Sequence, residues 1–358
     1  MDLLSLERLC GSIKPLREEA MAAARARLDS LTKPPGSLGA LERLAERLSG
    51  MTGEMPPALG KKAVVVMAGD HGVCEEGVSA YPSAVTEQMV LNFLAGGAAV
   101  NVFAKHAGAD VVCVDMGVAA TIEHPDLVAA KVAPGTANMT KGPAMTEEQA
   151  LRAVSAGVEL VGRLASEGVG LIALGEMGIG NTTAAAAVTS ALLGASPDAS
   201  VGRGTGIDDA GLARKRDAVT RALAANAVEP GARGPAAALA TLAKVGGFEL
   251  AGMAGVCLGA GVYRVPVVVD GYISTAAALV ASRMSPHASS YWIASHRSEE
   301  PGHGLALEAL GLAPMLELGM RLGEGTGAAL ALRIVEAAAD VLGSMATFAS
   351  AGVSGKLE

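Results

Sequence analysis

Four apolar runs, each ending at an acidic residue beside glycine, constrain the fold of this 358-residue chain more than any other feature. The runs occupy residues 63–70, 111–117, 169–176 and 265–270, and their acids are Asp70, Asp115, Glu176 and Asp270. Continuous Val, Ile and Leu runs separated by helical stretches are typical of a parallel sheet with helices on both faces, whose ligands bind beyond the carboxyl ends of the strands. The sequence therefore predicts an α/β fold in which the four acids line one crevice. Taken singly, each acid could instead cap a helix or occupy a turn.

Helical spacing of apolar residues fills the intervals between the runs. Crossover helices are expected over 83–107 and 146–166, and an alanine-rich helix over 182–193. A fifth short run, 291–294, ends at Ser295-His296-Arg297 and is expected to join the sheet. Further helices are predicted over 212–225, 235–261, 305–310, 316–320 and 328–342.

Both ends of the chain also have helical patterns. Within residues 2–50, the segment Lys33-Pro-Pro-Gly-Ser37 interrupts the pattern, because its prolines stop the first helix and Ser37 can cap the next. Lys33 is expected to be solvated on this turn. The last helix is expected to return to the N-terminal helices, so that the two chain ends form a small lobe.

The segment 169–183, VGLIALGEMGIGNTT, changes midway from a strand to a glycine-rich loop and a helix start. Glycines permit positive φ and a close ligand approach, and Asn181 or Thr182 could cap a helix whose free N–H groups attract an anion. We interpret this as a phosphate-binding turn, formed by Gly178, Gly180, Asn181, Thr182 and Thr183. Glu176 would then face the reacting part of the substrate. An ordinary loop with a solvated glutamate is the alternative.

Two later segments carry further candidates. The second glycine-rich loop, Gly202–Gly206, precedes a helix with Arg214, Lys215 and Arg216, one of which could reach a phosphate or a leaving group; a solvated basic face is the alternative. Glu324, between Gly323 and Gly325, has little side-chain cover from its neighbours, although it could simply cap the following helix.

Composition excludes several classes of function. The chain is 51% hydrophobic and 18% charged, which is typical of a globular protein with a large core. A net charge of −8 and only 3% aromatic residues offer neither the positive charge nor the stacking surfaces that nucleic acid needs, so nucleic acid is not expected as a partner. No segment is long and apolar enough to span a membrane, no signal peptide is recognisable, and the four cysteines form no CxxC pair. A cytoplasmic location is expected.

The chemistry can be narrowed by the motifs that are missing. There is no HExxH or other metal-ligand cluster, no P-loop and no GxSxG, so no metal or other cofactor is expected. An acid-lined crevice with anion-binding loops suits transfer chemistry on a sugar phosphate, since carboxylates stabilise positive charge at an anomeric carbon and can deprotonate a nucleophile. Asp208-Asp209 follows its glycine loop instead of preceding it, which points away from a magnesium-pyrophosphate mechanism.

Seven motifs together resemble one family along nearly the whole chain. They are Lys33-Pro-Pro-Gly-Ser-Leu-Gly39, Gly69-Asp-His-Gly-Val73, Gly175-Glu-Met-Gly-Ile-Gly-Asn-Thr-Thr183, Lys244-Val-Gly-Gly-Phe248, Asp270-Gly271, Ser295-His296 and Arg321-Leu-Gly-Glu-Gly325. The chain is similar to the nicotinate-nucleotide:dimethylbenzimidazole phosphoribosyltransferases of the cobalamin lower-ligand pathway. The resemblance implies a homodimer, a Rossmann-like large domain over 61–300, a small helical domain from 1–60 and 301–358, and no metal.

The resemblance also implies roles for individual residues. The general base falls on Glu324, and Glu176 and Lys215 match further active-site positions. The pocket for the base would be lined by Tyr81, Met89 and Met177. Further substrate-binding positions are Gly202, Ser295, Leu322 and Gly323, in addition to the phosphate-binding turn.

The implied reaction moves the phosphoribosyl group of nicotinate mononucleotide to dimethylbenzimidazole or a related base, giving α-ribazole 5′-phosphate and nicotinate. The pyridinium ring of the nucleotide is a good leaving group without metal or pyrophosphate. Two alternatives remain open: a non-catalytic or hydrolytic nucleotide-binding protein, and an NAD-binding oxidoreductase. The second is disfavoured by the missing third glycine of the dinucleotide fingerprint.

Overall fold

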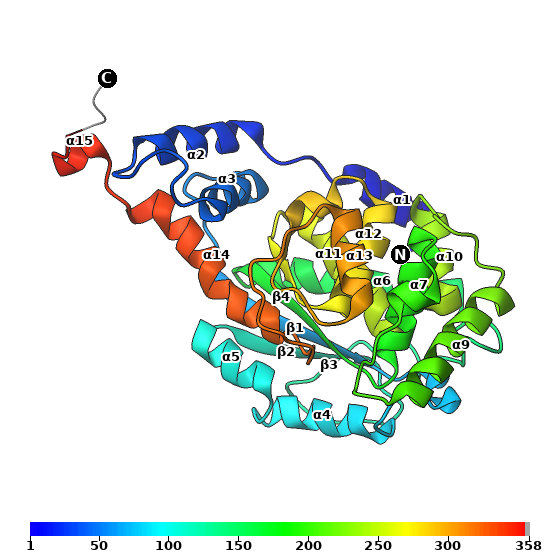
Figure 1. Cartoon of the computed structure of the whole chain (residues 1–358). Coiled ribbons are helices and arrows are strands. Elements are labelled where there is room, and N and C mark those ends of the chain that lie inside the picture. The colour runs from blue at the N-terminus through cyan, green and yellow to red at the C-terminus, as the bar shows by residue number, and fades with distance from the viewer. Residues whose placement is uncertain (355–358) are drawn as a thin grey trace.

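The computed structural model describes residues 1–354, and in them a single six-stranded sheet has every strand parallel to its neighbours (Figure 1). The strands are β1 (Lys61–Gly69), β2 (Asp110–Gly117), β3 (Val128–Ala129), β4 (Val169–Met177), β5 (Val267–Val269) and β6 (Trp292–Ala294). All five apolar runs are strands, so the predicted α/β fold with a parallel sheet is confirmed. The sequence does not predict β3, which is only two residues long.

The strand order is β3-β2-β1-β4-β5-β6. The chain therefore builds outward from β1 in one direction and, from β4 onward, in the other. Ligands of such sheets bind where the order reverses, beyond the carboxyl ends of the two central strands. Here that point lies between β1 and β4, where Met67 is in register with Glu176.

Helices account for most of the remaining chain. In order they are α1 (Leu3–Ser12), α2 (Glu18–Ser30), α3 (Ala40–Thr52), α4 (Ala84–Leu94), α5 (Ala99–Ala107), α6 (Glu147–Ser166), α7 (Asn181–Leu193), α8 (Pro197–Ser200), α9 (Asp209–Ala225), α10 (Pro235–Val245), α11 (Phe248–Tyr263), α12 (Tyr272–Met284), α13 (Pro301–Leu310), α14 (Thr326–Ser344) and α15 (Phe348–Ala351), with two 3-10 turns, η1 (Gly72–Glu76) and η2 (Ala288–Tyr291). Across residues 1–354, no helix combines the length and apolarity needed to cross a bilayer.

Three of the predicted helical ranges are interrupted and one is wrong. The first helix, expected to run to the turn at Lys33, is divided at residues 13–17 into α1 and α2. Residues 83–107 form α4 and α5, because Gly96 adopts a left-handed φ of +76° between them. Residues 235–261 likewise contain both α10 and α11. Residues 316–320 are not helical: Leu316 instead pairs with His296 in an isolated parallel bridge, extending the end of β6.

Helices cover both faces of the sheet. Side chains along a strand point alternately to its two faces, so Val64 and Met67 of β1 face opposite sides. A Cβ placed on Gly325, just before α14, would lie 3.0 Å from Val64 Cγ1, whereas one on Gly252 of α11 would lie 2.7 Å from Met67 Sδ. Thus α14, packed with α5, covers one face, and α11, packed with α6, covers the other.

The two chain ends meet, as predicted. Figure 1 shows α14 running from the sheet to α2 and α3, and Arg27 of α2 donates to the carbonyl of Met345 at 2.8 Å. However, α1 packs on α10 and α11, and α13 packs on α12 and α7, so both lie against the large lobe. The proposed domain division at residues 60 and 300 stays a prediction, and these contacts favour a second boundary after α13.

The turn before α3 corrects two expectations. Lys33 is buried and forms an ion pair with Glu42 at 2.8 Å, so it is not a solvated lysine. Ser37 does not cap α3; the cap position is Gly39, and the side chain that accepts the nearby N–H of Leu38 is Glu42. A single glutamate thus stabilises the turn and pairs with its buried cation.

Helices α6 and α11 pack closely because glycines face each other across their contact. A Cβ on Gly157 of α6 would overlap the carbonyl oxygen of Gly252, and one on Gly255 of α11 would overlap that of Val154. Neither carbonyl can move without breaking its own helix, so this contact requires glycine.

We expect Gly157→Ala to lower the free energy of unfolding by about 2 kcal/mol, because the added methyl group overpacks a rigid backbone contact. Gly304→Ala in α13 is the matched control: its Cβ would meet only Arg297 Nη1, at 4.0 Å. Since alanine is the better helix former, this variant should be stabilised by up to about 1 kcal/mol. Urea unfolding of both variants measures the difference, and equal effects would contradict the packing argument.

Candidate active site

A cavity of about 560 Å³ opens beyond the carboxyl end of β4, at the predicted position. It is lined by residues from six segments of the chain: the loop before α4 with α4 itself, the β4–α7 turn, the loop 202–206, the start of α12, residues 296–300 and residues 321–324. The predicted site residues on its wall are Tyr81, Met89, Glu176, Met177, Gly178, Asn181, Thr182, Leu322, Gly323 and Glu324. The fold therefore brings most of them together.

The turn that carries Glu324 has an unusual backbone. Gly323, Glu324 and Gly325 have φ values of +86°, +64° and +86°, so three consecutive residues are left-handed. A glutamate in this region costs roughly 1–3 kcal/mol of strain, which is typical of functional sites. The turn lies directly on β4: a Cβ on Gly175 would overlap the carbonyl of Glu324.

Asp270, just after β5, holds this turn in place. Its Oδ2 accepts from the N–H of Gly325 at 3.2 Å and its Oδ1 from that of Ala328 at 2.8 Å, while His296 Nδ1 lies 3.7 Å from Oδ1. The helix-cap alternative considered for Asp270 therefore describes it. By fixing the start of α14, Asp270 also fixes the backbone of Glu324.

The Glu324 carboxyl is largely buried, and within residues 1–354 its Oε2 has no hydrogen-bond partner. Burial raises its pKa above the usual glutamate range, and the charge of Asp270 adds to the effect, while the N–H of Val100 at the start of α5 opposes it. A buried carboxyl with a raised pKa, on a residue that lines a cavity, is a stronger proton acceptor than a solvated one.

Glu176 lies at the end of β4 beside the same turn. Asn181 Nδ2 donates to its Oε2, and the N–H of Glu324 donates to its Oε1 at 3.3 Å. Burial raises the pKa of Glu176 to about 8, and the charges of Asp270 and Glu249 act in the same direction. The Glu176 carboxyl is therefore protonated at neutral pH.

The phosphate-binding turn differs in detail from its prediction. Neither Asn181 nor Thr182 caps α7: the cap position is Gly180, with φ +96°, and in the described chain it makes no side-chain cap hydrogen bond. Asn181 is instead directed to Glu176. The N–H groups of Ile179, Asn181 and Thr183 already donate within the protein, to Thr86 Oγ1 and to the carbonyls of Gly178 and Gly180. Among the described residues the N–H of Thr182 has no such acceptor and is left for an anion. Thr183 lies beneath the turn, fully buried.

Lys215 stands behind this turn, not on the cavity wall. It is fully buried in α9, and its Nζ donates to Thr182 Oγ1 at 2.8 Å and to the carbonyl of Gly202 at 3.1 Å. Burial lowers the pKa of Lys215 to about 8, opposed by the charge of Glu300. Lys215 thereby joins the two glycine-rich loops that the sequence singled out.

The remaining predicted residues support the wall from behind. Ser295 is buried, and its hydroxyl is 3.0 Å from His296 Nδ1. Gly202 lies against Glu300, where a Cβ would overlap the carboxylate. Gly180 lies against Cys74, whose Sγ would be 2.7 Å from an added Cβ.

Two of the four strand-end acids lie elsewhere, which corrects the expectation of one crevice. Asp115 forms an ion pair with Lys131 at 3.2 Å, and Asp70 accepts from the N–H of Ala119 at 2.8 Å. Both therefore serve the loop after β2, on the other side of β1. Of the four, only Glu176 lines the cavity.

Several residues of the wall are absent from the predicted site residues, among them Glu300, Arg321 and Thr205. Glu300 accepts from the N–H of Gly204 at 2.8 Å, Arg321 Nη1 lies 3.5 Å from the carbonyl of Gly204, and Thr205 lines the cavity beside them. Arg321 belongs to the family motif 321–325 and Thr205 to the glycine-rich loop 202–206, whereas the only sequence signal for Glu300 is the proline that follows it. In residues 1–354, no group of three or more His, Cys, Asp or Glu residues could hold a metal ion, and a metal-free mechanism stays a prediction.

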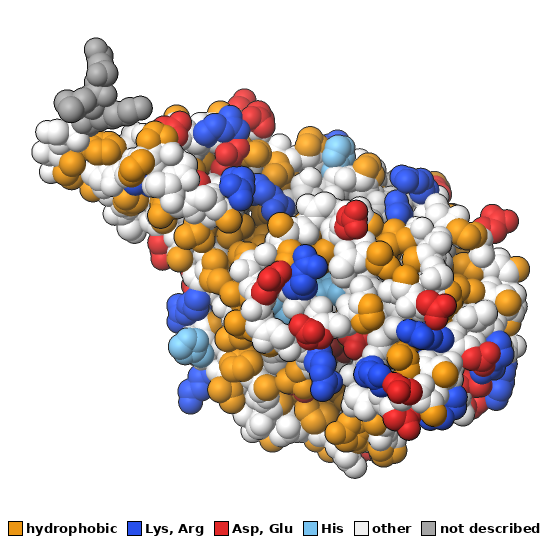
Figure 2. Space-filling model, in the orientation of Figure 1, with side chains coloured by type: hydrophobic (Ala, Val, Ile, Leu, Met, Phe, Trp, Pro, Cys, Tyr) orange, Lys and Arg blue, Asp and Glu red, His pale blue; other side chains and the backbone are white. Residues whose placement is uncertain are grey.

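The face in Figure 2 carries acidic and basic side chains interspersed, without a broad basic patch.

Known proteins resemble this chain over nearly its whole length. A family model described as "Phosphoribosyltransferase" matches residues 13–353. The nicotinate-nucleotide--dimethylbenzimidazole phosphoribosyltransferase of Chloroflexus aggregans is 54% identical over 354 residues, 99% of each chain, and the protein of that name from Geobacter metallireducens is 51% identical, covering 97% of this chain and 98% of its own.

A solved structure agrees. The crystal structure of CobT from Thermus thermophilus matches with a TM-score of 0.90 and 54% sequence identity, covering 94% of this chain and 100% of that one. The family resemblance drawn from the motifs is thus confirmed by sequence and by fold. The chain belongs to the nicotinate-nucleotide:dimethylbenzimidazole phosphoribosyltransferase family.

Proposed function

We propose that this enzyme transfers the phosphoribosyl group of nicotinate mononucleotide to dimethylbenzimidazole or a related base, in assembly of the cobalamin nucleotide loop. The products are α-ribazole 5′-phosphate and nicotinate. The observation that carries the proposal for the site is Glu324, which lines the cavity from a strained turn and whose buried Oε2 has no partner among the described residues.

In the proposed reaction, a ring nitrogen of the base attacks C1′ of the ribose from the face opposite nicotinate. The C1′–N bond to nicotinate breaks, and its electron pair returns to the pyridinium ring, which becomes neutral. Glu324 takes the proton from the other ring nitrogen of the azole. A single displacement inverts C1′, so a β-nucleotide gives an α-ribotide.

Glu176 and Glu324 differ in the proton they hold. Glu176 is neutral at pH 7 because burial and neighbouring acids raise its pKa to about 8. A neutral Glu176 accepts from the N–H of Glu324 without adding a second negative charge beside it. We assign general-base catalysis to Glu324 and a positioning role to Glu176.

The nucleotide phosphate is assigned to the turn Gly178–Thr183, where α7 begins without a side-chain cap among the described residues. Lys215 supports this position from behind through Thr182. Gly202 and Ser295 support the wall, and Leu322 and Gly323 complete it. The homodimer and the cytoplasmic location belong to the same proposal and are supported by the family resemblance.

Our first functional prediction separates the two glutamates. Glu324→Gln keeps the size of the side chain but removes the proton acceptor, so kcat should fall by about 10² to 10⁴ fold with nucleotide binding nearly unchanged. Glu176→Gln is the matched control, because an amide resembles a protonated carboxyl; we expect a loss of about tenfold at most. Mass analysis of ribotide and nicotinate follows both products.

Activity of Glu324→Gln within about threefold of wild type would remove Glu324 from the role of general base. Nicotinate release without ribotide, in the wild-type enzyme, would instead favour the hydrolytic alternative.

The second prediction concerns stability and pH. Folded Glu176 holds its proton up to about pH 8, against an ordinary value of 4.5, so between these values the folded protein binds more protons than the unfolded chain. Its contribution is fully present below the lower value and is lost as pH rises through the higher one, with a slope of at most about 1.4 kcal/mol per pH unit. Urea unfolding from about pH 5 to 8 should show a shallower fall for Glu176→Gln; identical slopes would contradict the assignment.

The third prediction concerns the base. Tyr81, Met89 and Met177 line the cavity, and methionine adapts to planar rings of varied outline while tyrosine offers a broad stacking face. We therefore expect a tolerant enzyme that uses dimethylbenzimidazole well, accepts benzimidazole, and extends to a phenol or a purine. Tyr81→Ser should narrow or reorder this preference. Competition between equimolar bases tests it: conversion of dimethylbenzimidazole alone, unaltered by Tyr81→Ser, would show that these side chains do not set the choice.

A further inference from the structure

Three loops form the mouth of the cavity. They are residues 77–83 with Tyr81, residues 202–206 with Gly204 and Thr205, and residues 321–323 with Leu322. Tyr81 and Leu322 are more than half exposed, at 56% and 58%, so both are apolar side chains at the rim that a bound ring could cover. The contacts that hold Tyr81 in this position therefore affect how tightly a base can bind.

Hydrogen bonds join the first loop to Thr205. The N–H of Ala80 donates to Thr205 Oγ1 at 3.0 Å, and the hydroxyls of Ser79 and Thr205 are 3.2 Å apart. The N–H of Tyr81 donates in turn to Ser79 Oγ at 3.2 Å. In the described chain, every hydrogen bond from residues 78–81 to another segment ends on Thr205.

Thr205 is also next to the phosphate end of the site. Its neighbour Gly204 has a left-handed φ of +50°, and a Cβ there would lie 2.6 Å from Thr182 Oγ1 and 3.0 Å from Lys215 Nζ. Glu300 and Arg321 bind the N–H and the carbonyl of the same glycine. Residues 204–205 therefore contact the phosphate-binding turn and the Tyr81 loop at once.

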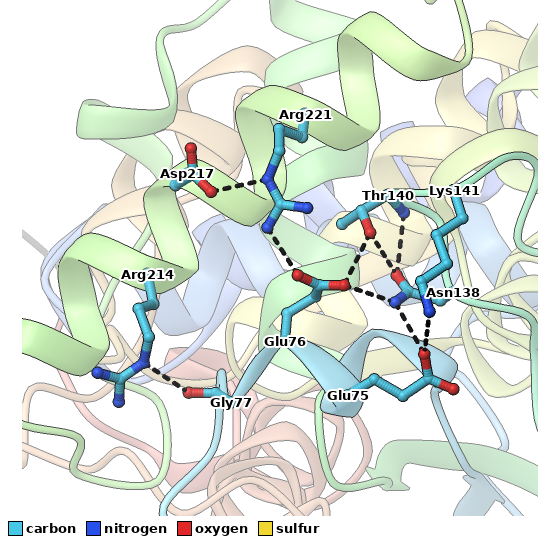
Figure 3. A network of polar contacts seen from close by, with 9 residues as sticks. All are labelled: Glu75, Glu76, Gly77, Asn138, Thr140, Lys141, Arg214, Asp217 and Arg221. Carbon is cyan, nitrogen blue, oxygen red and sulfur yellow. Dashed lines mark hydrogen bonds and ion pairs between the residues drawn. The ribbon is translucent and has the colours of Figure 1, made fainter.

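A polar network fixes the start of the Tyr81 loop (Figure 3). Glu76, at the end of η1, accepts from Arg221 and from Asn138, both at 2.7 Å, and Arg214 Nε lies 3.5 Å from the carbonyl of Gly77. Arg214 and Arg221 belong to α9, the helix that carries Lys215. The loop is thus anchored at residue 77. Its second attachment is at Ser79 and Ala80, just before Tyr81, where it contacts Thr205.

We propose that Thr205 is a positioning residue for the base, which holds Tyr81 at the rim of the cavity from a loop that also contacts the phosphate-binding turn. The inference rests on the proposed function and adds to it a residue that governs the affinity for the base. Lys215, Glu300 and Arg321 hold the loop 202–206 by contacts that do not involve Thr205 Oγ1. Loss of this hydroxyl should therefore release Tyr81 without disturbing the phosphate end of the site.

Steady-state kinetics with both substrates varied tests the proposal. Thr205→Val keeps the shape of the side chain but cannot accept from Ala80, so KM for dimethylbenzimidazole at saturating nucleotide should rise about five- to tenfold. KM for the nucleotide should change less than about twofold.

Two further variants make the result specific. Thr205→Ser keeps the hydroxyl and should restore the wild-type values. Thr220→Val, an identical change on exposed α9 where the hydroxyl donates to Arg216 of its own helix, should have no effect. Both controls distinguish loss of this contact from a general effect of replacing threonine.

An unchanged base KM in Thr205→Val, or an equal rise in KM for both substrates, would overturn the inference while leaving the proposed function intact. A wild-type enzyme that forms no ribotide from these substrates would overturn the proposed function, and the inference with it.

Discussion

The active site depends on one close backbone contact, in which the turn Gly323–Gly325 lies directly on Gly175 of β4. A side chain at 175 would overlap the Glu324 carbonyl, so glycine at this position permits the approach. The contact brings together two glutamates that lie 148 residues apart in the chain. The left-handed backbone of Glu324 costs roughly 1–3 kcal/mol, and the two N–H groups bound by Asp270 offset part of that cost.

The buried titratable groups around this contact influence one another's protonation. Burial alone would lower the pKa of His71, but the charge of Glu249, 2.8 Å away, raises it above its usual value. Burial, and then the charges of Asp270 and Glu249, raise the pKa of Glu176. The Glu176 carboxyl is therefore kept neutral, which is consistent with the proposed assignment of the general base to Glu324.

The sequence predicts the sheet well because its strands are continuous runs of valine, isoleucine and leucine, whose length and flanking glycines are local features. It does not predict β3, because two residues carry no pattern. Residues 316–320 follow a helical spacing but bind the end of β6 instead, which is a tertiary contact that no local pattern reveals. Lys33 is misjudged for the same reason, since its partner Glu42 lies across a turn.

The same distinction, between local sequence patterns and tertiary contacts, applies to the candidate site. Motif residues such as Glu176 and Glu324 could be found from glycine spacing and from the family resemblance. Asp70 and Asp115 end strands in the same way as Glu176, yet the reversal of strand order at β1 places them beside the loop after β2. Thr205 and Glu300 act through partners about a hundred residues away, on surfaces that exist only after folding.

Helix α14 connects the small lobe with the candidate site. This helix begins at Thr326, two residues after Glu324, and ends where Arg27 of α2 binds the carbonyls of Leu342 and Met345. Figure 1 shows it crossing from the sheet to α2 and α3. A rigid helix held at its far end by α2 and α3, and at its near end by Asp270, has a fixed axis. The packing of α14 on α2 and α3 therefore helps to fix the position of Glu324 on the cavity wall, and links these N-terminal helices to the candidate site.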